Sequence, residues 1–343
     1  MAEQLCDRSE PKPTPSPICH SSPVRYAETV QQRDTERQAG EIQASSQTIN
    51  RTKKRRGKRG RGRTVYSISN SCKSNNLKCE GQMWSIYQLN IRGLNSKKSS
   101  LESILSSLNP SPNLLAISES HMKFETKVNI PGYSSYSRNR KDKSQGGIVT
   151  SVRDDESIDC LKVTEGQDCN EFIITRHSKF QTPINVINLY SCQENRTAVN
   201  VIRDQWQEIV EEVVKIEAKK ENLIIIGDFN KHVGDIIEGN HSKITEGGRL
   251  IRELLNNGDY VLLNSLTSKI KGGPFTRVEP SDPDNDDKKS CIDFIIASSD
   301  LVKYVDEIVI DRDRKVTPSH AMKSNKLTYP DHLAIMTSFK NIK

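Results

Sequence analysis

The sequence predicts an α+β fold in which two packed β-sheets carry helices on their outer faces. Short apolar runs of strand length recur from Met83 to the end of the 343-residue chain, whereas helical periodicity occurs in only three segments. Strands and helices do not follow one another in strict alternation, which argues against a doubly wound parallel sheet. A sandwich of two sheets fits this order of elements better.

The predicted strands are runs rich in branched and aromatic residues that end at polar or turn residues. The first, WSIYQLNI, alternates in polarity, and the sixth, NLIIIGDFN, contains the continuous apolar run of a buried strand. The strands are expected at residues 84–91, 113–120, 146–152, 172–177, 184–190, 222–230, 260–264, 291–298, 305–310 and 332–339.

The predicted helices have apolar residues three and four positions apart, so that each helix buries one side. Leu101 and Leu105 mark the first helix, Trp206 and Ile209 mark the second, and Gly258 ends the third. The helices are expected at residues 97–108, 197–219 and 247–258.

The N-terminal part differs from the rest of the chain in charge and composition. Residues 1–80 contain 16 Lys and Arg against 8 Asp and Glu, a net charge of +8, whereas the remaining residues contain 35 against 36, a net charge of −1. Residues 1–50 are rich in Ser, Gln, Pro and Thr and lack apolar periodicity. We therefore expect residues 1–80 to be a disordered basic tail and residues 83–341 to form the folded domain.

A run of basic residues and glycines, RTKKRRGKRGRGR, spans residues 51–63. Like charges repel along such a run, and it has no apolar face with which to fold alone. The run favours nucleic-acid binding or nuclear targeting, and a solvated, non-specific basic patch is the alternative. The candidate nucleic-acid-binding residues are Arg55, Arg56, Lys58, Arg59, Arg61 and Arg63.

The sequence argues against several protein classes. The N-terminus has no apolar segment typical of a signal peptide, and no run of about eighteen apolar residues is present that could span a membrane. None of the eight cysteines forms a CxxC pair, and no histidine pair has the spacing of zinc ligands. We expect an intracellular protein with reduced thiols and no membrane partner, and the basic run points to the nucleus.

Polar residues stand at or near the ends of several predicted strands. Side chains at strand ends are held rigidly, and we expect these to converge at one edge of a sheet. Carboxylates bind a hard cation such as Mg²⁺, asparagine amides hydrogen-bond phosphate oxygens, and a histidine–carboxylate pair handles a proton. Such residues are those of phosphodiester hydrolysis. They are Asn90, Glu119, Tyr190, Asp228, Asn230, Asp293, Asp331 and His332.

Each of these residues also has an ordinary structural explanation. Asn90 could be a turn residue, Glu119 a surface carboxylate, and the Asp331–His332 pair purely structural. The GDFN tract is more specific, because it places two polar side chains on the same side of a strand that leaves the core, with an Asx turn as the alternative. Asp293 lies within the apolar run CIDFII, where burial without a partner is unfavourable, and a histidine is the natural partner.

The sequence contains seven motifs in the order QLNIRGLNS, LLAISESH, GGI, NLYS, LIIIGDFN, SCIDFII and YPDHLAI. Their order is similar to that of the endonuclease/exonuclease/phosphatase (DNase I-like) superfamily. The resemblance covers about residues 84–340 and is closest to the apurinic-endonuclease-like domains of non-LTR (LINE-type) retrotransposons. It implies a four-layer α/β/β/α sandwich of two mixed sheets, a Mg²⁺ cofactor with Mn²⁺ as an alternative, and a nick in DNA that leaves a 3′-hydroxyl to prime target-site reverse transcription.

The resemblance implies a catalytic role for five of the candidate residues. Asp228 resembles the group that orients or deprotonates the attacking water, and Asn230 resembles a phosphate contact beside it. Tyr190 resembles the tyrosine that contacts the scissile phosphate. His332 resembles the phosphate-contacting histidine, and Asp293 resembles the carboxylate that orients it.

The resemblance implies three metal-binding residues, with Glu119 as the main ligand beside Asn90 and Asp331. The chain departs from the apurinic-endonuclease pattern at Arg92, where an acidic residue is usual, so that metal coordination rests more heavily on Glu119. Residues 191–193, Ser-Cys-Gln, stand where the family often has Pro-Asn after the tyrosine.

Two other functions stay open at this point. Phosphatases and phosphodiesterases that act on inositol phosphates or RNA share the implied scaffold, and a catalytically decayed copy could bind nucleic acid without cutting it. DNA is the expected partner, and element RNA and a downstream reverse transcriptase domain are further partners that the resemblance suggests. Loops 277–290 and 311–330 are candidates for target choice, or else surface insertions.

Overall fold

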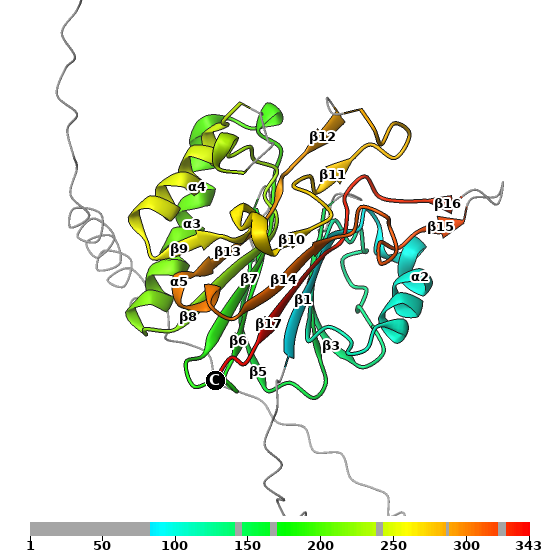
Figure 1. Cartoon of the computed structure of the whole chain (residues 1–343), viewed down its shortest axis with the longest axis horizontal. Helices are drawn as coiled ribbons and strands as arrows, with labels where there is room; N and C mark the ends of the chain where they lie inside the picture. The colour runs from blue at the N-terminus through cyan, green and yellow to red at the C-terminus, as the bar shows by residue number, and fades with distance from the viewer. Residues whose placement is uncertain (1–82, 141–145, 165–169, 238–242, 286–287, 322–326) are drawn as a thin grey trace, which may run out of the picture. The chain divides into compact units, whose positions relative to one another are not determined.

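The computed structural model describes residues 83–140, 146–164, 170–237, 243–285, 288–321 and 327–343. The expected disordered tail lies outside the described residues, and so do all six candidate nucleic-acid-binding residues of the 51–63 run. The described residues form two large β-sheets with helices on their outer faces (Figure 1). The α+β sandwich predicted from the sequence is therefore confirmed.

The first sheet has seven strands, with β1 at its centre. β1 is parallel to β2 and antiparallel to β17, so the beginning and the end of the described chain pair directly. Across the sheet, the strands are β10 (Ile270–Lys271), β14 (Val305–Ile310), β17 (Ile335–Lys340), β1 (Met83–Asn90), β2 (Leu114–Ser118), β4 (Ile148–Arg153) and β3 (Tyr133–Arg138).

The second sheet has six strands, and β8 lies between a parallel and an antiparallel neighbour. Both sheets are therefore mixed, as expected. Across the second sheet, the strands are β5 (Ile158–Val163), β6 (Asn170–His177), β7 (Ile184–Ser191), β8 (Asn222–Asp228), β13 (Asp293–Ser298) and β9 (Tyr260–Leu262).

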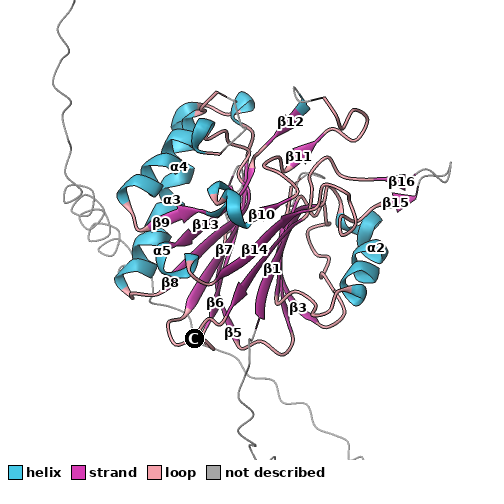
Figure 2. Ribbon diagram, viewed as in Figure 1, coloured by secondary structure: helices cyan, strands magenta, loops and turns pink. Residues whose placement is uncertain are grey.

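Helices and two short strand pairs complete the described structure (Figure 2). The α-helices are α2 (Leu94–Ser107), α3 (Val199–Ala218), α4 (Glu246–Asn257) and α5 (Ser299–Val302). The 3₁₀ helices are η1 (Glu194–Arg196), η2 (Gly234–Ile236), η3 (Leu263–Ser265) and η4 (Thr267–Lys269). The short antiparallel pairs are β11 (Arg277–Val278) with β12 (Lys289–Ser290) and β15 (His320–Ala321) with β16 (Leu327–Thr328). None of the described helices is long and apolar enough to cross a membrane.

Three apolar cores separate the layers of the sandwich. Ile86 and Ile224 belong to the core between the two sheets. Ile225 belongs to the core that α3 and α4 close over the second sheet, and Leu89 belongs to the core that α2 closes over the first. Neighbouring residues of one strand enter different cores because side chains alternate across a sheet. The order of layers is therefore helix, sheet, sheet, helix.

The structure differs from the sequence prediction at several element boundaries. The prediction missed β3 and β5, which are edge strands without a continuous apolar run. Helix α2 begins at Leu94, three residues before the predicted start at 97. The strand predicted at 332–339 begins only at Ile335, because the preceding segment turns to pair with β11, where Leu333 N–H donates to the Thr276 carbonyl.

Gly227 is required by the close approach of β7 and β8. It has a φ of 145° and lies opposite Leu189 in the parallel ladder. A Cβ at this position would collide with the Leu189 carbonyl oxygen. We expect Gly227→Ala to lower the free energy of unfolding by more than about 2 kcal/mol, because the substitution adds a backbone clash to an unfavourable φ.

Urea denaturation followed by circular dichroism measures this loss. Gly132→Ala is the matched control, since Gly132 also has a positive φ, 79°, but no atom lies within 4 Å of its added Cβ. The control is expected to lose only about 1 kcal/mol. Equal losses in the two variants would show that the contact with β7 is unimportant.

Candidate active site

Polar side chains from both sheets meet at one end of the core between them. Asn90 is the last residue of β1, Glu119 follows β2, and Asp228 ends β8. Asp293 is the first residue of β13 and lies opposite Asp228, because those strands are antiparallel. His332 precedes β17, which is antiparallel to β1. The site therefore combines the C-terminal ends of some strands with the N-terminal ends of others.

Several residues around this site have an uncommon backbone conformation. Arg92, Glu119, His121 and Asn230 have φ values of 45°, 50°, 50° and 50°. Non-glycine residues rarely adopt positive φ, and such strain is concentrated at functional sites. Here it allows the chain to turn sharply after β1, β2 and β8, so that polar side chains remain beside the strand ends.

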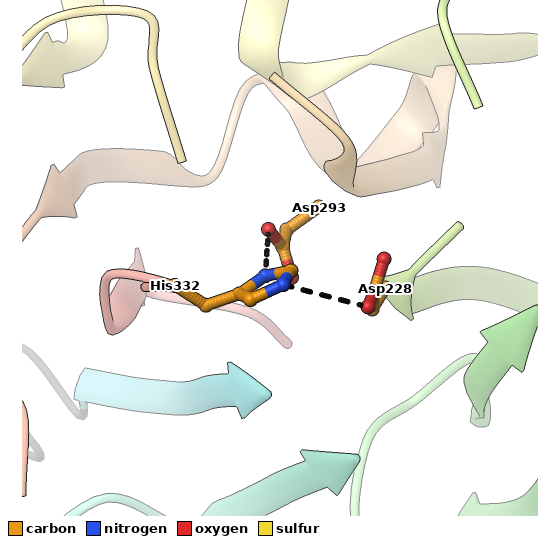
Figure 3. Close-up of side chains that lie close together, drawn as sticks. All are labelled: Asp228, Asp293 and His332. Carbon is orange, nitrogen blue, oxygen red and sulfur yellow. Dashed lines mark hydrogen bonds and ion pairs between the residues drawn. The ribbon is translucent and has the colours of Figure 1, made fainter. Parts of the chain in front are cut away.

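His332 and Asp293 form a hydrogen-bonded pair in the interior (Figure 3). His332 Nδ1 lies 2.9 Å from Asp293 Oδ2. The same carboxylate accepts hydrogen bonds from Gln88 Nε2 at 2.9 Å and from Thr276 Oγ1 at 2.8 Å. Asp293 is fully buried, and these three contacts provide the partners that its burial requires. They fix the carboxylate, and through it the imidazole ring.

The surroundings of His332 favour its protonated form. Burial by itself lowers the pKa of His332, but the charges of Asp293 and Asp228 outweigh burial and raise the pKa to about 9. Burial raises the pKa of Asp228, and the nearby His332 opposes that rise. His332 Nε2 lies 3.9 Å from Asp228 Oδ2 (Figure 3). This separation is too long for a direct hydrogen bond, so both atoms can still bind a water or a phosphate oxygen.

Asp228 is held in place by the two asparagines of the site. Asn90 Nδ2 donates to Asp228 Oδ2 at 2.8 Å across the gap between the sheets. The backbone N–H of Asn230 donates to Asp228 Oδ1 at 2.9 Å, which closes an Asx turn. Asn230 Nδ2 donates to the Ser191 carbonyl at 2.8 Å. The GDFN tract thus forms an Asx turn, as its alternative structural explanation predicted, and its Asp228 and Asn230 also belong to the site.

Glu119 is the most accessible of the carboxylates beside Asn90. It accepts hydrogen bonds from Asn90 Nδ2 and from the Tyr190 hydroxyl, each at 3.0 Å, and it lies 3.2 Å from His121 Nε2. Burial alone would raise the pKa of Glu119, but the hydrogen bonds from His121 and Asn90 contribute to lowering it to about 2. Burial and the Glu119 charge raise the pKa of Tyr190. Glu119 is therefore ionised and Tyr190 is a neutral donor.

The donor set suits a hard divalent cation. Glu119 supplies an ionised carboxylate that accepts a hydrogen bond from Asn90 Nδ2, and the amide oxygen of Asn90 accepts one weak hydrogen bond from Arg92 N at 3.2 Å. Oxygen donors of this kind are those that Mg²⁺ prefers. Asp228, Asp293 and His332 also have ligand atoms within 4.8 Å of one another. In that second group, however, hydrogen bonds already engage both Asp293 oxygens, so Glu119 is the better candidate.

Asp331 has different neighbours from the other predicted metal-binding residues. Its Oδ1 accepts a hydrogen bond from Arg92 Nη1 at 2.7 Å, and its Oδ2 accepts one from Arg277 Nε at 2.8 Å. Arg92 Nε also lies 3.9 Å from Glu119 Oε2. Arg92 therefore links the carboxylates Asp331 and Glu119.

A cavity of about 430 Å³ opens over these side chains. It is large enough to admit a nucleotide-sized group, and all but one of its lining residues have polar side chains. It is lined by Arg92, Glu119, Gln193, Glu194, Asn195, Asn230, His232, Thr245, Arg277, Ser290, Ile292, Asp331 and His332.

The sequence reasoning missed several contributors to the site. Gln88 lies two residues before Asn90 on the same face of β1, and this spacing was a usable signal. Thr276 lies in a segment without periodicity, so no local pattern indicated it, and Arg277 was included only as the first residue of loop 277–290, a candidate for target choice. The eight residues predicted from strand ends all lie in the described part, and hydrogen bonds or ion pairs connect them into one network.

Residues 87–319 match the model of the Endonuclease/Exonuclease/phosphatase family. This range includes Glu119, Asp228 and Asp293 but ends before Asp331 and His332. No curated protein matches the sequence.

Several solved structures share the fold. The AP endonuclease LMAP from Leishmania major is 15% identical with a TM-score of 0.58, and the match covers 76% of this chain and 88% of that one. A 3′ phosphatase from Neisseria, solved with product DNA hairpin, is 17% identical with a TM-score of 0.54, over 75% and 99% of the two chains. The endonuclease domain of TRAS1, a telomere-specific non-LTR retrotransposon, is 13% identical with a TM-score of 0.50, over 76% and 100%.

The protonation of His332 is directly measurable. We expect the His332 imidazole to titrate near pH 9, because Asp293 and Asp228 stabilise its positive charge. In Asp293→Asn, the midpoint should fall toward the ordinary value of about 6.5. Imidazole ¹⁵N chemical shifts, assigned with His332→Gln, follow both titrations.

His232 is the internal control, since it lines the same cavity but burial lowers its pKa. Its midpoint should lie below about 6.5 and should not respond to Asp293→Asn. A His332 midpoint at or below that of His232 would contradict the charged pair.

Proposed function

The chain belongs to the endonuclease/exonuclease/phosphatase family, and from this membership we propose that it is a divalent-metal-dependent endonuclease that nicks DNA and leaves a 3′-hydroxyl. The observation that carries the proposal is a cavity lined by Glu119 and His332, with His332 held by Asp293 and lying 3.9 Å from the buried Asp228. These residues provide a carboxylate that can position water, an ionised metal ligand and a fixed cation.

Each side chain has a distinct task in the proposed reaction. Asp228, fixed by Asn90 and Asn230, accepts a hydrogen bond from the attacking water and aligns it with phosphorus. His332, whose Nδ1 is bonded to Asp293, has Nε2–H available to stabilise the charge that develops on the phosphate oxygens. Tyr190 holds Glu119 by donating its hydroxyl hydrogen.

The metal ion is assigned to Glu119 and the Asn90 amide oxygen, and Asp331 is the weaker candidate ligand because both its oxygens already accept hydrogen bonds from arginines. When bound there, Mg²⁺ or Mn²⁺ supplies positive charge that polarises the phosphate and stabilises the leaving oxygen. Glu119 suits this role because it is already ionised, so that metal binding does not require it to lose a proton.

We further propose that the substrate is DNA and that the protein acts in a non-LTR retrotransposon. Both proposals are supported by the order of the seven motifs and by the basic run at residues 51–63, which suits a polyanion and a nuclear location. In such an element, the 3′-hydroxyl left by the nick primes reverse transcription, and element RNA and a reverse transcriptase domain are the further partners. The structural neighbours include proteins described with product DNA or as a retrotransposon endonuclease.

Plasmid nicking tests the function. Wild-type protein should convert supercoiled plasmid to the open circle in Mg²⁺, and chelation with EDTA should abolish the reaction. Asp228→Ala and His332→Ala should each lower the nicking rate by roughly two orders of magnitude or more, because each removes a group that acts on the water or on the developing charge.

Asp300→Asn is the control variant, since its side chain is 79% exposed in α5 outside the cavity, and it should nick at the wild-type rate. Poly(A) RNA and a phosphoinositide complete the substrate panel. Faster turnover of either substrate than of plasmid DNA would indicate that the protein is another kind of phosphodiesterase or phosphatase with this fold. DNA binding without nicking in both Mg²⁺ and Mn²⁺ would instead indicate a catalytically decayed copy.

Glu119→Gln tests the metal assignment. This variant keeps the size of the side chain but loses the negative charge, so we expect it to need at least about ten-fold more Mg²⁺ for half-maximal nicking. The measurement is the nicking rate as a function of Mg²⁺ concentration. Asp331→Asn, examined in parallel, separates the two candidate carboxylates. An unchanged Mg²⁺ requirement in Glu119→Gln would rule out Glu119 as the main ligand.

A further inference from the structure

The Asp331 carboxylate forms ion pairs with two arginines at the edge of the cavity. Arg92 approaches from the turn after β1, and Arg277 approaches from β11. The carboxylate is nearly buried, whereas the arginine side chains are 50% and 41% exposed. Arg92 Nε also lies 3.9 Å from Glu119 Oε2, so the two exposed guanidinium groups stand beside the site proposed for phosphodiester cleavage.

The three residues are held by the backbone as well as by their ion pairs. Arg277 forms an antiparallel bridge with His332, and Val278 N–H donates to the Asp331 carbonyl at 2.8 Å. On the other side, Arg92 N donates to Asn90 Oδ1 at 3.2 Å, and the Arg92 carbonyl accepts a hydrogen bond from Lys97 Nζ at 2.8 Å. The arginines are therefore positioned by the same segments that position Asn90 and His332.

Both arginines retain unused hydrogen-bond donors. A guanidinium has five N–H groups, and among the described residues each of these two makes one hydrogen bond, through Nη1 in Arg92 and through Nε in Arg277. Both side chains line the cavity that His332 and Asn230 also line. Fixed, partly exposed guanidinium groups with spare donors are suited to binding phosphate oxygens.

We propose that Arg92 and Arg277, held by Asp331, form a clamp for a phosphate next to the scissile one in a nucleic-acid strand. This inference rests on the proposed function and identifies the substrate feature that the site selects, namely a phosphodiester with a charged neighbour. Asp331 acts as a positioning residue whose oxygens orient the two arginines. The scissile phosphate itself is assigned to His332 and to the metal ligands.

The arrangement is poorly explained as a purely structural ion pair. Arg277 alone would be enough to compensate the Asp331 charge, and ion pairs of half-exposed side chains, including that of Arg92 with Glu119, contribute little to stability. A second guanidinium beside the first adds repulsion, which a bound phosphate would relieve.

Metal-free binding tests the clamp without any catalytic turnover. The full chain and its Arg92→Ala and Arg277→Ala variants are titrated against a fluorescein-labelled DNA duplex in EDTA, by fluorescence anisotropy at several KCl concentrations. Each substitution should weaken binding and reduce the slope of log Kd against log [KCl] by about 1, since each removes a phosphate contact. Arg277→Lys should keep most of the salt dependence, because the charge remains.

Arg176→Ala is the matched control. Arg176 is also an arginine held by a carboxylate, donating from Nε and Nη2 to Glu221, but it lies toward the other end of β6, away from the site. It should bind DNA as the wild type does. Wild-type affinity and slope in both clamp variants would overturn the proposal.

DNA substrates with single uncharged linkages then identify which phosphate the clamp binds. Replacing single phosphates beside a mapped nick by methylphosphonates should raise the wild-type KM roughly ten-fold at one flanking position. Arg277→Ala should be insensitive to that same replacement, with a KM that is already raised and a kcat close to that of the wild type.

The two proposals fail in different ways. If wild-type protein never nicks DNA but the salt slope falls in the clamp variants, the endonuclease proposal fails and the phosphate clamp stands as a binding site. If wild-type protein nicks and Arg277→Ala loses kcat equally on every substrate, including the neutral ones, the arginine acts on the scissile phosphate and the clamp is wrong.

Discussion

The site depends on the burial of two carboxylates directly opposite each other. Asp228 and Asp293 are register partners in β8 and β13, and both are fully buried between the sheets. Two like charges in such a position are unfavourable unless donors and a cation compensate them. His332 supplies the cation, and the amides of Asn90 and Gln88 supply donors from the other sheet. The sheets are therefore tied together at the place where chemistry is proposed.

Strand β1 makes this connection through its side-chain alternation. Ile86 packs in the core between the sheets, and Gln88 and Asn90 follow on the same face and end in the site. Tyr87 and Leu89 point the other way, into the core beneath α2. A shift of β1 by one residue would exchange these two sets, so the apolar packing on both faces also fixes the register of the Gln88 and Asn90 amides.

The sequence was sufficient to predict the sandwich because most strands contain an apolar run that identifies them as strands without knowledge of their tertiary contacts. It also predicted the site residues at strand ends, since polar residues that interrupt an apolar run are conspicuous. It was not sufficient for β3 and β5, where a sheet edge tolerates polar residues. Nor did it indicate Thr276, which contacts Asp293, or the contact of Arg277 with Asp331, because these residues are distant in the chain. Such contacts leave no local periodicity.

The pairing of β1 with β17 has a consequence for the order in which the protein is made. Asn90 and Glu119 leave the ribosome early, whereas His332 and the final strand of the first sheet leave it late. Until β17 is added, β1 lacks a neighbour along one edge, and Asp228 and Asp293 lack their cation. A nascent chain is thus unable to assemble the candidate site, which is completed only after His332 and β17 have been synthesised.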